Sequence, residues 1–440
     1  MDKYKQLLPG YIKNKSISTD AAFQDGIVAT VEWLRQQFTD SGFEVTVVEG
    51  YDNPIVVASY VADPSYKTCL IYGHYDVQPA DESEGWDSDP FVATERGGRF
   101  YCRGAIDNKG QNLVHVVSII ELVKAGKLGY NVKFMIEGNE ETGSPNLEQF
   151  LKDKKDLLKA DFVMISDGEL TANLPTIELG FRGGFNLTLT VTTSSTDLHS
   201  GMFGGAAPSS AHELAKLIAG LYDKDNRITI PGFYDGVDEI TDDIRKNNER
   251  IPFSEEEYQK LSGTKGRLGE PGYDFYTQTA LRPSIQVTGI KSGYTGDGYR
   301  NSIPASSTAK INFRLVLHQD PNAVIKLFTD YVKNAVPDYV DVVVEPSDPY
   351  DGIKLSPDSE YIAKAYQTLQ EVYGSKPLYK YVGGGIPVVT YFNDLMGIPT
   401  VSVPLANEDC YMHAANENFT LDCVEKGLAF SRKFFGRDQV

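Results

Sequence analysis

The sequence lacks the long hydrophobic runs that membrane proteins need. No stretch approaches the roughly 18 consecutive apolar residues that span a bilayer. The first residues, MDKYKQLLPGYIKNKSIST, contain neither a long apolar segment nor a small-residue cleavage site, so we expect no secretory signal peptide. Internal repeats and low-complexity tracts are also missing. We therefore expect a globular protein that has no membrane partner.

Cysteine is scarce as well. The chain has four cysteines, Cys69, Cys102, Cys410 and Cys423, and none of them belongs to a CxxC pair. Free, partly buried thiols in a reducing compartment are the simplest interpretation, which favours a cytoplasmic location.

Positive charge is in deficit. The 42 Lys and Arg residues face 61 Asp and Glu residues, which gives a net charge of −19. A surface of this sign repels phosphate backbones, so nucleic acid is a poor partner. The same charge favours solubility but identifies no substrate.

The chain of 440 residues is too long for one ordinary core, and its hydrophobic pattern predicts two domains. In the first, short apolar strands alternate with helices, which is typical of an α/β domain built on a parallel sheet with helices on both faces. Strands are expected at residues 43–50, 53–62, 67–73, 131–138, 160–166 and 398–405, and helices at 20–42, 108–126, 147–158, 359–374 and 423–436.

The pattern changes near Gly180, where strands begin to alternate apolar with polar residues. The segments that follow have the order β-α-β-β-α-β of a ferredoxin-like unit, with a polar stretch rich in Tyr and Gly at about 223–282. The predicted elements are strands 183–193, 284–290, 308–317 and 339–346 and helices 208–223 and 321–336. We therefore expect a smaller domain of residues 181–351, inserted into a larger α/β domain of residues 1–180 plus 352–440.

Side chains that can bind metal ions follow the ends of several predicted strands. The carboxyl ends of parallel strands meet at one edge of a sheet, where ligands bind, and random scatter would not place so many such groups there. The candidates are His74 and Asp76 in GHYDVQP, Asp107 in CRGAIDNKG, Glu140 and Glu141 in EGNEETGS, Asp167 in ISDGE, and His413 in YMHAANE.

These residue types suit a hydrolytic site with two divalent metal ions. Imidazoles and carboxylates fit zinc, manganese or cobalt. One bridging carboxylate can hold two ions roughly 3.5–4 Å apart, and the ions lower the pKa of a shared water. A further carboxylate must accept the proton of that water, and the adjacent Glu140 and Glu141 offer one base and one ligand. Asp76 can orient the imidazole of His74.

Together, GHYDVQPA, GWDSDPF, CRGAIDNKGQ, EGNEETGS, DLHSGMFGG and HAANE resemble the aminoacylase, carboxypeptidase G and carnosinase family of metallopeptidases. Within it, the chain is most similar to the carnosinase-like, nonspecific dipeptidase branch, from about residue 20 to the C-terminus. The resemblance implies a dinuclear-metal exopeptidase fold whose inserted domain acts as a lid and forms a homodimer. It also implies a small peptide substrate, cleaved near its free carboxylate.

The resemblance assigns roles at the metal site. It implies that His74, Asp107 and Asp167 hold one metal ion, and that Asp107, Glu141 and His413 hold the other, with Asp107 as the bridge. Glu140 is then the general base, and Asp76 supports His74.

Other roles fall in the inserted domain and its return. By the resemblance, His199 in DLHSGMFGG serves the partner subunit's site and stabilises the oxyanion, and Arg314 in NFRLV binds the substrate carboxylate. The loop of Gly383, Gly384 and Gly385 presents backbone N–H groups to that carboxylate. Two positions depart from the family pattern, because Gly385 stands where serine is usual and Tyr350 where a histidine is expected.

Two alternatives remain beside a dipeptidase or carboxypeptidase. An amidohydrolase that removes an acyl group from an amino acid would use the same ligands and the same mechanism, and only its pocket would differ. A non-catalytic binding protein would have lost ligands or Glu140, yet all are present. The remaining histidines, including His115 within a strongly apolar helix, are interpreted as structural.

Overall fold

The computed structural model describes residues 1–385 and 387–437, and the chain divides into two compact units. The first comprises Met1–Leu179, Leu355–Lys380 and Val388–Val440, and the second comprises Gly180–Lys354 and Tyr381–Pro387. The sequence pattern gave no sign that the short segment after Lys380 groups with the second unit. None of the helices in the described ranges combines the length and apolarity needed to cross a bilayer.

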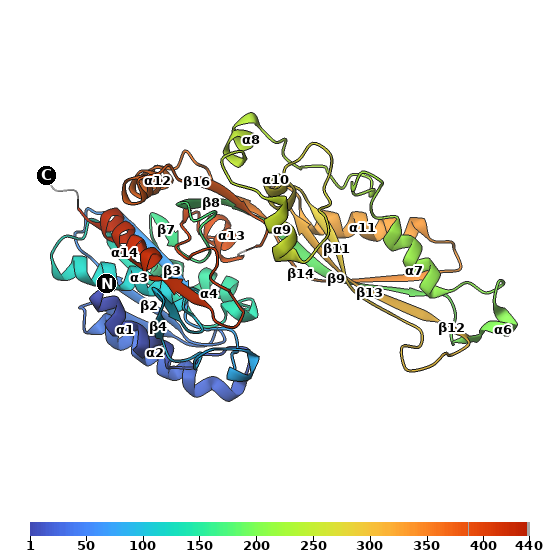
Figure 1. Ribbon diagram of the computed structural model, residues 1–440, viewed down its shortest axis with the longest axis horizontal. Coiled ribbons are helices and arrows are strands. Elements are labelled where there is room, and N and C mark those ends of the chain that lie inside the picture. Colours follow the sequence, from blue (N-terminus) through green and yellow to red (C-terminus); the bar gives the residue numbers. More distant parts are fainter. Residues whose placement is uncertain (386, 438–440) are drawn as a thin grey trace. The chain divides into compact units, whose positions relative to one another are not determined.

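The first unit is an α/β structure (Figure 1). Its helices are α1 Asp2–Ile12, α2 Gln24–Thr39, α3 Lys109–Lys124, α4 Leu147–Asp153, α5 Lys155–Leu158, α12 Glu360–Tyr373, α13 Pro387–Asp394 and α14 Leu421–Phe435. Its strands are β1 Glu44–Val48, β2 Ile55–Tyr60, β3 Thr68–His74, β4 Thr94–Arg96, β5 Arg99–Tyr101, β6 Asn131–Glu137, β7 Phe162–Ile165, β8 Thr176–Phe181, β16 Leu378–Val382, β17 Thr400–Ser402 and β18 Asn418–Thr420.

The main sheet has the strand order β1-β2-β6-β3-β7-β17-β8-β15, in which β15 is Ile353–Lys354, with β16 also paired to β8. Strands β6, β3, β7 and β17 run parallel, and the near-continuous burial of β3 and β6 explains their long apolar runs. The predicted parallel sheet is found at the centre, whereas towards the edges β1–β2, β2–β6 and β17–β8 are antiparallel. The connection between β1 and β2 is too short for the crossover that a parallel pair requires.

The second unit has a ferredoxin-like core. Its four-stranded sheet has the order β11-β13-β9-β14, with all neighbours antiparallel. The stacked rings of Phe185 and Phe313, 4.5 Å apart, lie in the core of this unit. The elements are β9 Gly183–Thr192, β10 Leu198–His199, α6 Ser200–Phe203, α7 Ser210–Ala219, α8 Asp242–Asn248, α9 Glu255–Ser262, α10 Phe275–Ala280, β11 Ser284–Ser292, β12 Ser302–Ile303, β13 Ser306–Leu315, α11 Pro321–Ala335, β14 Asp341–Tyr350 and β15 Ile353–Lys354.

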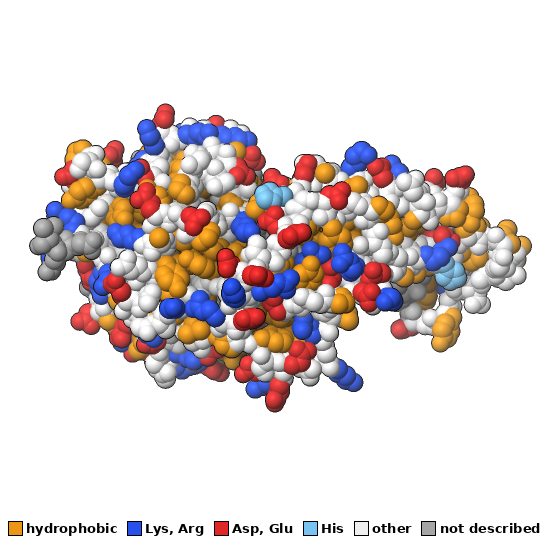
Figure 2. All heavy atoms as spheres, turned by 90° about the horizontal axis from the view of Figure 1, so that it is seen from above, with side chains coloured by type: hydrophobic (Ala, Val, Ile, Leu, Met, Phe, Trp, Pro, Cys, Tyr) orange, Lys and Arg blue, Asp and Glu red, His pale blue; other side chains and the backbone are white. Residues whose placement is uncertain are grey.

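The predicted fold class, an α/β domain with an inserted ferredoxin-like unit, is therefore confirmed. Helix α1, the small β18-β5-β4 sheet and helices α8–α10 of the polar stretch were not anticipated. All four cysteines are free, and they are buried more completely than expected. Acidic and basic side chains are interspersed on the face shown in Figure 2, so the negative charge does not form a single patch there.

His115 is a buried core residue of α3, as its apolar surroundings predicted. Its ring nitrogens lie 3.1 Å from Ser431 Oγ and 2.9 Å from Ser166 Oγ. Burial lowers the pKa of His115 to about 4, because the charged imidazolium would lose its hydration.

We expect His115 to make stability depend on pH. Below about pH 6.5 the unfolded chain binds a proton at this residue, whereas the folded protein binds it only near pH 4. Stability is therefore present at neutral pH and is lost as pH falls through this window, by up to about 3 kcal/mol. Denaturant titrations of wild type and His115→Asn should show a stability difference that shrinks from pH 7 to pH 4.5. The exposed His212→Asn serves as the control, and a constant difference for His115→Asn would contradict the prediction.

Candidate metal centre

The carboxyl ends of the parallel strands bring the expected metal ligands of the first unit together. His74 is the last residue of β3, Asp167 follows β7, and His413 lies in the loop after β17. Glu141 lies in a short 3-10 turn after β6, and Asp107 lies just before α3. These five side chains form two groups of three that share Asp107, with ligand atoms within 4.8 Å of one another in each group: His74, Asp107 and Asp167, and Asp107, Glu141 and His413.

Asp107 lies between the two imidazoles. His74 Nε2 lies 3.0 Å from its Oδ1, and His413 Nε2 lies 2.7 Å from its Oδ2. The outer carboxylates are close as well, because Asp167 Oδ2 lies 3.5 Å from His74 Nε2 and Glu141 Oε2 lies 3.4 Å from His413 Nε2. A carboxylate whose two oxygens face two different imidazoles has the geometry of a bridging ligand.

The protonation of the site reflects this crowding of carboxylates. Burial would raise the pKa of Asp107, but hydrogen bonds from His413 and His74 hold it below its ordinary value. The hydrogen bond to Asp107 raises the pKa of His413 to about 9. Burial raises the pKa of Glu140 to about 8 and that of Glu141 to about 7, and neighbouring carboxylates add to both shifts. In the absence of cations, protons therefore offset the negative charge that metal ions would otherwise balance.

Two further observations fit divalent cations. The Glu141 Oε1 atom is buried and has no hydrogen-bond partner among the described residues, which is costly unless another ligand satisfies it. The donor set of imidazole nitrogens and carboxylate oxygens is the one that zinc and manganese accept. The residues present thus fit a pair of such ions.

Asp76 connects the two halves of the site. Its backbone oxygen lies 3.0 Å from His74 Nδ1, which leaves Nε2 to face Asp107. Its carboxylate accepts hydrogen bonds from the backbone N–H groups of Glu140 and Glu141, at 3.2 and 3.1 Å, and from the Ser18 hydroxyl at 2.6 Å. This residue therefore fixes the ring of His74 and the turn that carries both glutamates.

The Glu140 carboxylate differs from that of Glu141. Glu141 accepts a hydrogen bond from Gln78 Nε2 at 2.6 Å and belongs to one of the ligand groups. The Glu140 side chain belongs to neither group, and no hydrogen bond from the described residues reaches it. The two neighbours in sequence thus have different surroundings.

Sequence reasoning missed the buried pair of Arg103 and Glu417, although both residues lie within quoted motifs. Arg103 Nη1 donates to Glu417 Oε2 at 2.8 Å, and the two side chains are 2% and 0% exposed. Glu417 also accepts hydrogen bonds from the backbone N–H groups of Gly104, Ile106 and Asp107. Arg103 Nη2 donates to the carbonyl of His413 at 3.2 Å. The pair therefore fixes the backbone at two expected ligands.

The other expected site residues belong to the second unit. His199 is exposed at the end of β10, and its Nδ1 accepts a hydrogen bond from the Gly201 N–H at 3.1 Å. Arg314 on β13 donates from Nη1 to the Tyr350 hydroxyl at 2.8 Å. Gly384 and Gly385 follow β16, and the carbonyl of Gly384 accepts a hydrogen bond from the backbone N–H of Arg182.

Comparison with known proteins identifies the class of enzyme to which this fold and these ligand groups belong. Residues 70–437 match the model of peptidase family M20/M25/M40. The chain belongs to this family, as its motifs predicted, and is a hydrolase of peptide bonds.

Individual proteins of known activity are similar to this chain over most of its length. The Beta-Ala-His dipeptidase of Rattus norvegicus is 32% identical over 87% of this chain and 79% of its own. The Cys-Gly metallodipeptidase dug1 of Schizosaccharomyces pombe is 29% identical over 97% of this chain and 94% of its own. The crystal structure of the M20 family metallo-carboxypeptidase Sso-CP2 from Sulfolobus solfataricus superimposes with a TM-score of 0.85, at 31% identity and 99% coverage of both chains.

We expect Glu417→Gln to destabilise the metal-free protein. The amide leaves Arg103 buried without a counter-charge, which typically costs about 3–5 kcal/mol. Glu95→Gln is the matched control, because its ion pair with Lys5 is exposed and such pairs contribute at most about 1 kcal/mol. Denaturant unfolding after exhaustive chelation measures both variants, and equal losses would contradict a special role for the buried pair.

Proposed function

We propose that this protein is a dinuclear-metal dipeptidase that cleaves dipeptides or short peptides near the free C-terminal carboxylate. The observation that carries the proposal is the pair of three-residue ligand groups that share Asp107, in a chain of a peptidase family. Two relatives are dipeptidases and a third is a metallo-carboxypeptidase, and all three names describe action near a chain end. Zinc or manganese is the proposed metal, with cobalt as a possible substitute. The four free cysteines support a reducing, cytoplasmic setting.

In this proposal each residue has one task. His74, Asp107 and Asp167 hold one ion, and Asp107, Glu141 and His413 hold the other. When bound, the two ions supply a water of lowered pKa and polarise the scissile carbonyl.

Glu140 accepts the proton of the attacking water and delivers it to the leaving amine. Its carboxylate is suited to this task because it belongs to neither ligand group and accepts no hydrogen bond from the described residues. Asp76 keeps the glutamate turn and His74 in place.

Substrate binding falls to the second unit. Arg314 pairs with the substrate carboxylate, for which a planar guanidinium is well suited, and N–H groups of the Gly384–Gly385 loop assist. His199 donates a hydrogen bond to the oxygen that gains negative charge. Since Nδ1 already accepts from Gly201, the neutral ring carries its hydrogen on Nε2, where it is available to donate.

We further propose a homodimer formed through the second unit, in which His199 acts in the partner subunit's site. Exposed apolar residues next to His199 support this interface, because Met202 is 76% and Phe203 42% exposed.

Substrate assays test the function itself. We expect the metal-free protein to be inactive and added zinc, manganese or cobalt to restore hydrolysis of dipeptides at rates well above those for N-acyl amino acids. Full activity after exhaustive removal of metals would contradict the metal-dependent mechanism. A preference for N-acyl amino acids would instead identify the amidohydrolase alternative.

Glu140→Gln tests the general base. An amide cannot accept the proton of water, so we expect turnover to fall by about 100-fold or more while both metal ions stay bound. Glu141→Gln is the contrasting variant and should lose metal. Elemental analysis of the purified variants, beside their turnover numbers, decides, and metal loss in Glu140→Gln but not in Glu141→Gln would show that the two roles are reversed.

Mixed dimers test His199. Homodimers of His199→Ala and of Glu140→Gln should each be nearly inactive, because loss of one oxyanion donor typically costs on the order of 100-fold or more. After subunit exchange, heterodimers contain one site with an intact Glu140 and an intact His199, and should regain activity. Exchange is verified by a mass label on one chain, and exchanged heterodimers as inactive as their parents would show that His199 does not act across the interface.

A further inference from the structure

Tyr350 and Arg314 approach each other across strand β9. Both residues pair with Gly184 in the sheet, Arg314 from β13 and Tyr350 from the end of β14. Gly184 has no side chain, so nothing on the central strand separates them. Arg314 Nη1 donates to the Tyr350 hydroxyl oxygen at 2.8 Å, and both side chains are half-buried.

The ring of Tyr350 is held against the glycine loop. A Cβ atom on Gly385 would lie 2.5 Å from Tyr350 Cε2 and 2.6 Å from the carbonyl oxygen of Arg182, closer than real Cβ atoms come. The tyrosine ring at 350 and the glycine at 385 are therefore coupled by packing. A side chain at position 385 would meet both the ring of Tyr350 and the backbone carbonyl of Arg182, so packing in this chain requires the glycine.

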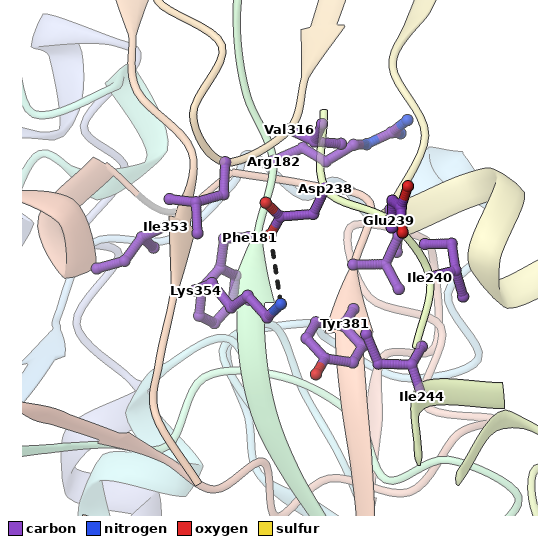
Figure 3. A pocket seen from close by; sticks show the side chains of 14 residues that line it. Phe181, Arg182, Asp238, Glu239, Ile240, Ile244, Val316, Ile353, Lys354 and Tyr381 are labelled. Carbon is purple, nitrogen blue, oxygen red and sulfur yellow. Dashed lines mark hydrogen bonds and ion pairs between the residues drawn. The ribbon is translucent and has the colours of Figure 1, made fainter. Parts of the chain in front are cut away.

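Arg182 also holds the glycine loop, through two hydrogen bonds. Its backbone N–H donates to Gly384 O at 3.0 Å, and its Nε donates to Gly383 O at 2.8 Å. Arg182 also lines a cavity of about 30 Å³ in the second unit, across which Lys354 reaches toward Asp238 (Figure 3). A cavity of this size holds little more than one water molecule, so it is no substrate site.

The cluster contains two arginines, Arg182 and Arg314, that form no ion pair within 4.0 Å among the described residues. Burial and the nearby charge of Arg314 lower the pKa of Arg182 to about 10. Two neighbouring guanidinium groups without a carboxylate partner favour an anion, and the hydroxyl of Tyr350 lies beside one of them.

We propose that Tyr350 is a second substrate-binding residue, whose hydroxyl donates a hydrogen bond to the substrate carboxylate while Arg314 binds the same group. The hydroxyl oxygen already accepts from Arg314, and among the described residues its hydrogen has no acceptor. Arg182 is a positioning residue that holds the glycine loop against the ring. The inference rests on the proposed function, because it assigns Tyr350 to the carboxylate that Arg314 is proposed to bind.

Tyr350→Phe tests the proposal, because it keeps the ring against Gly385 and removes only the hydroxyl. The substrates are a dipeptide that the wild type cleaves and its C-terminal amide. For the free acid we expect kcat/KM to fall about tenfold, mainly through KM, since a hydrogen bond to a charged group is lost. For the amide we expect a change below about twofold. The matched control is Tyr339→Phe, at an exposed tyrosine of the same unit, which should leave both substrates unchanged.

Arg314→Ala, assayed on the same two substrates, separates the possible failures. A selective loss on the free acid in both Arg314→Ala and Tyr350→Phe supports the proposal. A selective loss in Arg314→Ala alone overturns the role of Tyr350 and leaves the proposed function intact. Equal losses on both substrates in Tyr350→Phe reduce Tyr350 to a structural residue and overturn the proposal. If the wild type does not prefer the free acid and Arg314→Ala changes neither substrate, then Arg314 and Tyr350 do not bind the substrate carboxylate. The dependence of activity on metal ions still tests the proposed hydrolase function separately.

Discussion

A single buried carboxylate organises the first unit of this protein. Asp107 presents one oxygen to His74 and the other to His413, and two further carboxylates complete the groups around it. Like charges at this density are stable in a protein interior only when cations or protons balance them. The negative charge of Asp107 and Glu141 favours a proton on His413, whose pKa is raised. Divalent metal ions would provide the same balance and add catalytic chemistry.

The surrounding structure is arranged to hold this cluster in place. Parallel strands end at a common edge and bring candidate metal ligands together from distant parts of the sequence. The buried pair of Arg103 and Glu417 fixes the backbone at Asp107 and His413, and Asp76 fixes the turn that carries the glutamates. Such supporting contacts orient the side chains that could bind metal ions.

The second unit has a cluster of side chains with the opposite charge. Its cluster of Arg182, Arg314 and Tyr350 is cationic, and its neighbouring loop is built of glycine. In the first unit the site requires cations, and in the second the cluster favours an anion. Tyr350 and Gly385 also show how one packing contact can couple two positions that lie far apart in the sequence.

The sequence by itself determined the fold class, the family and the metal-competent residues. Strand periodicity and the position of His74 or Asp167 after an apolar run depend on local patterns that a linear sequence carries. The antiparallel edges of the main sheet, the grouping of Tyr381–Pro387 with the second unit and the partners of Glu417 depended on tertiary structure. The contact of Tyr350 with Gly385 did so too. Distances between distant residues arise only when the chain is packed, and only packing decides which buried charge faces which partner.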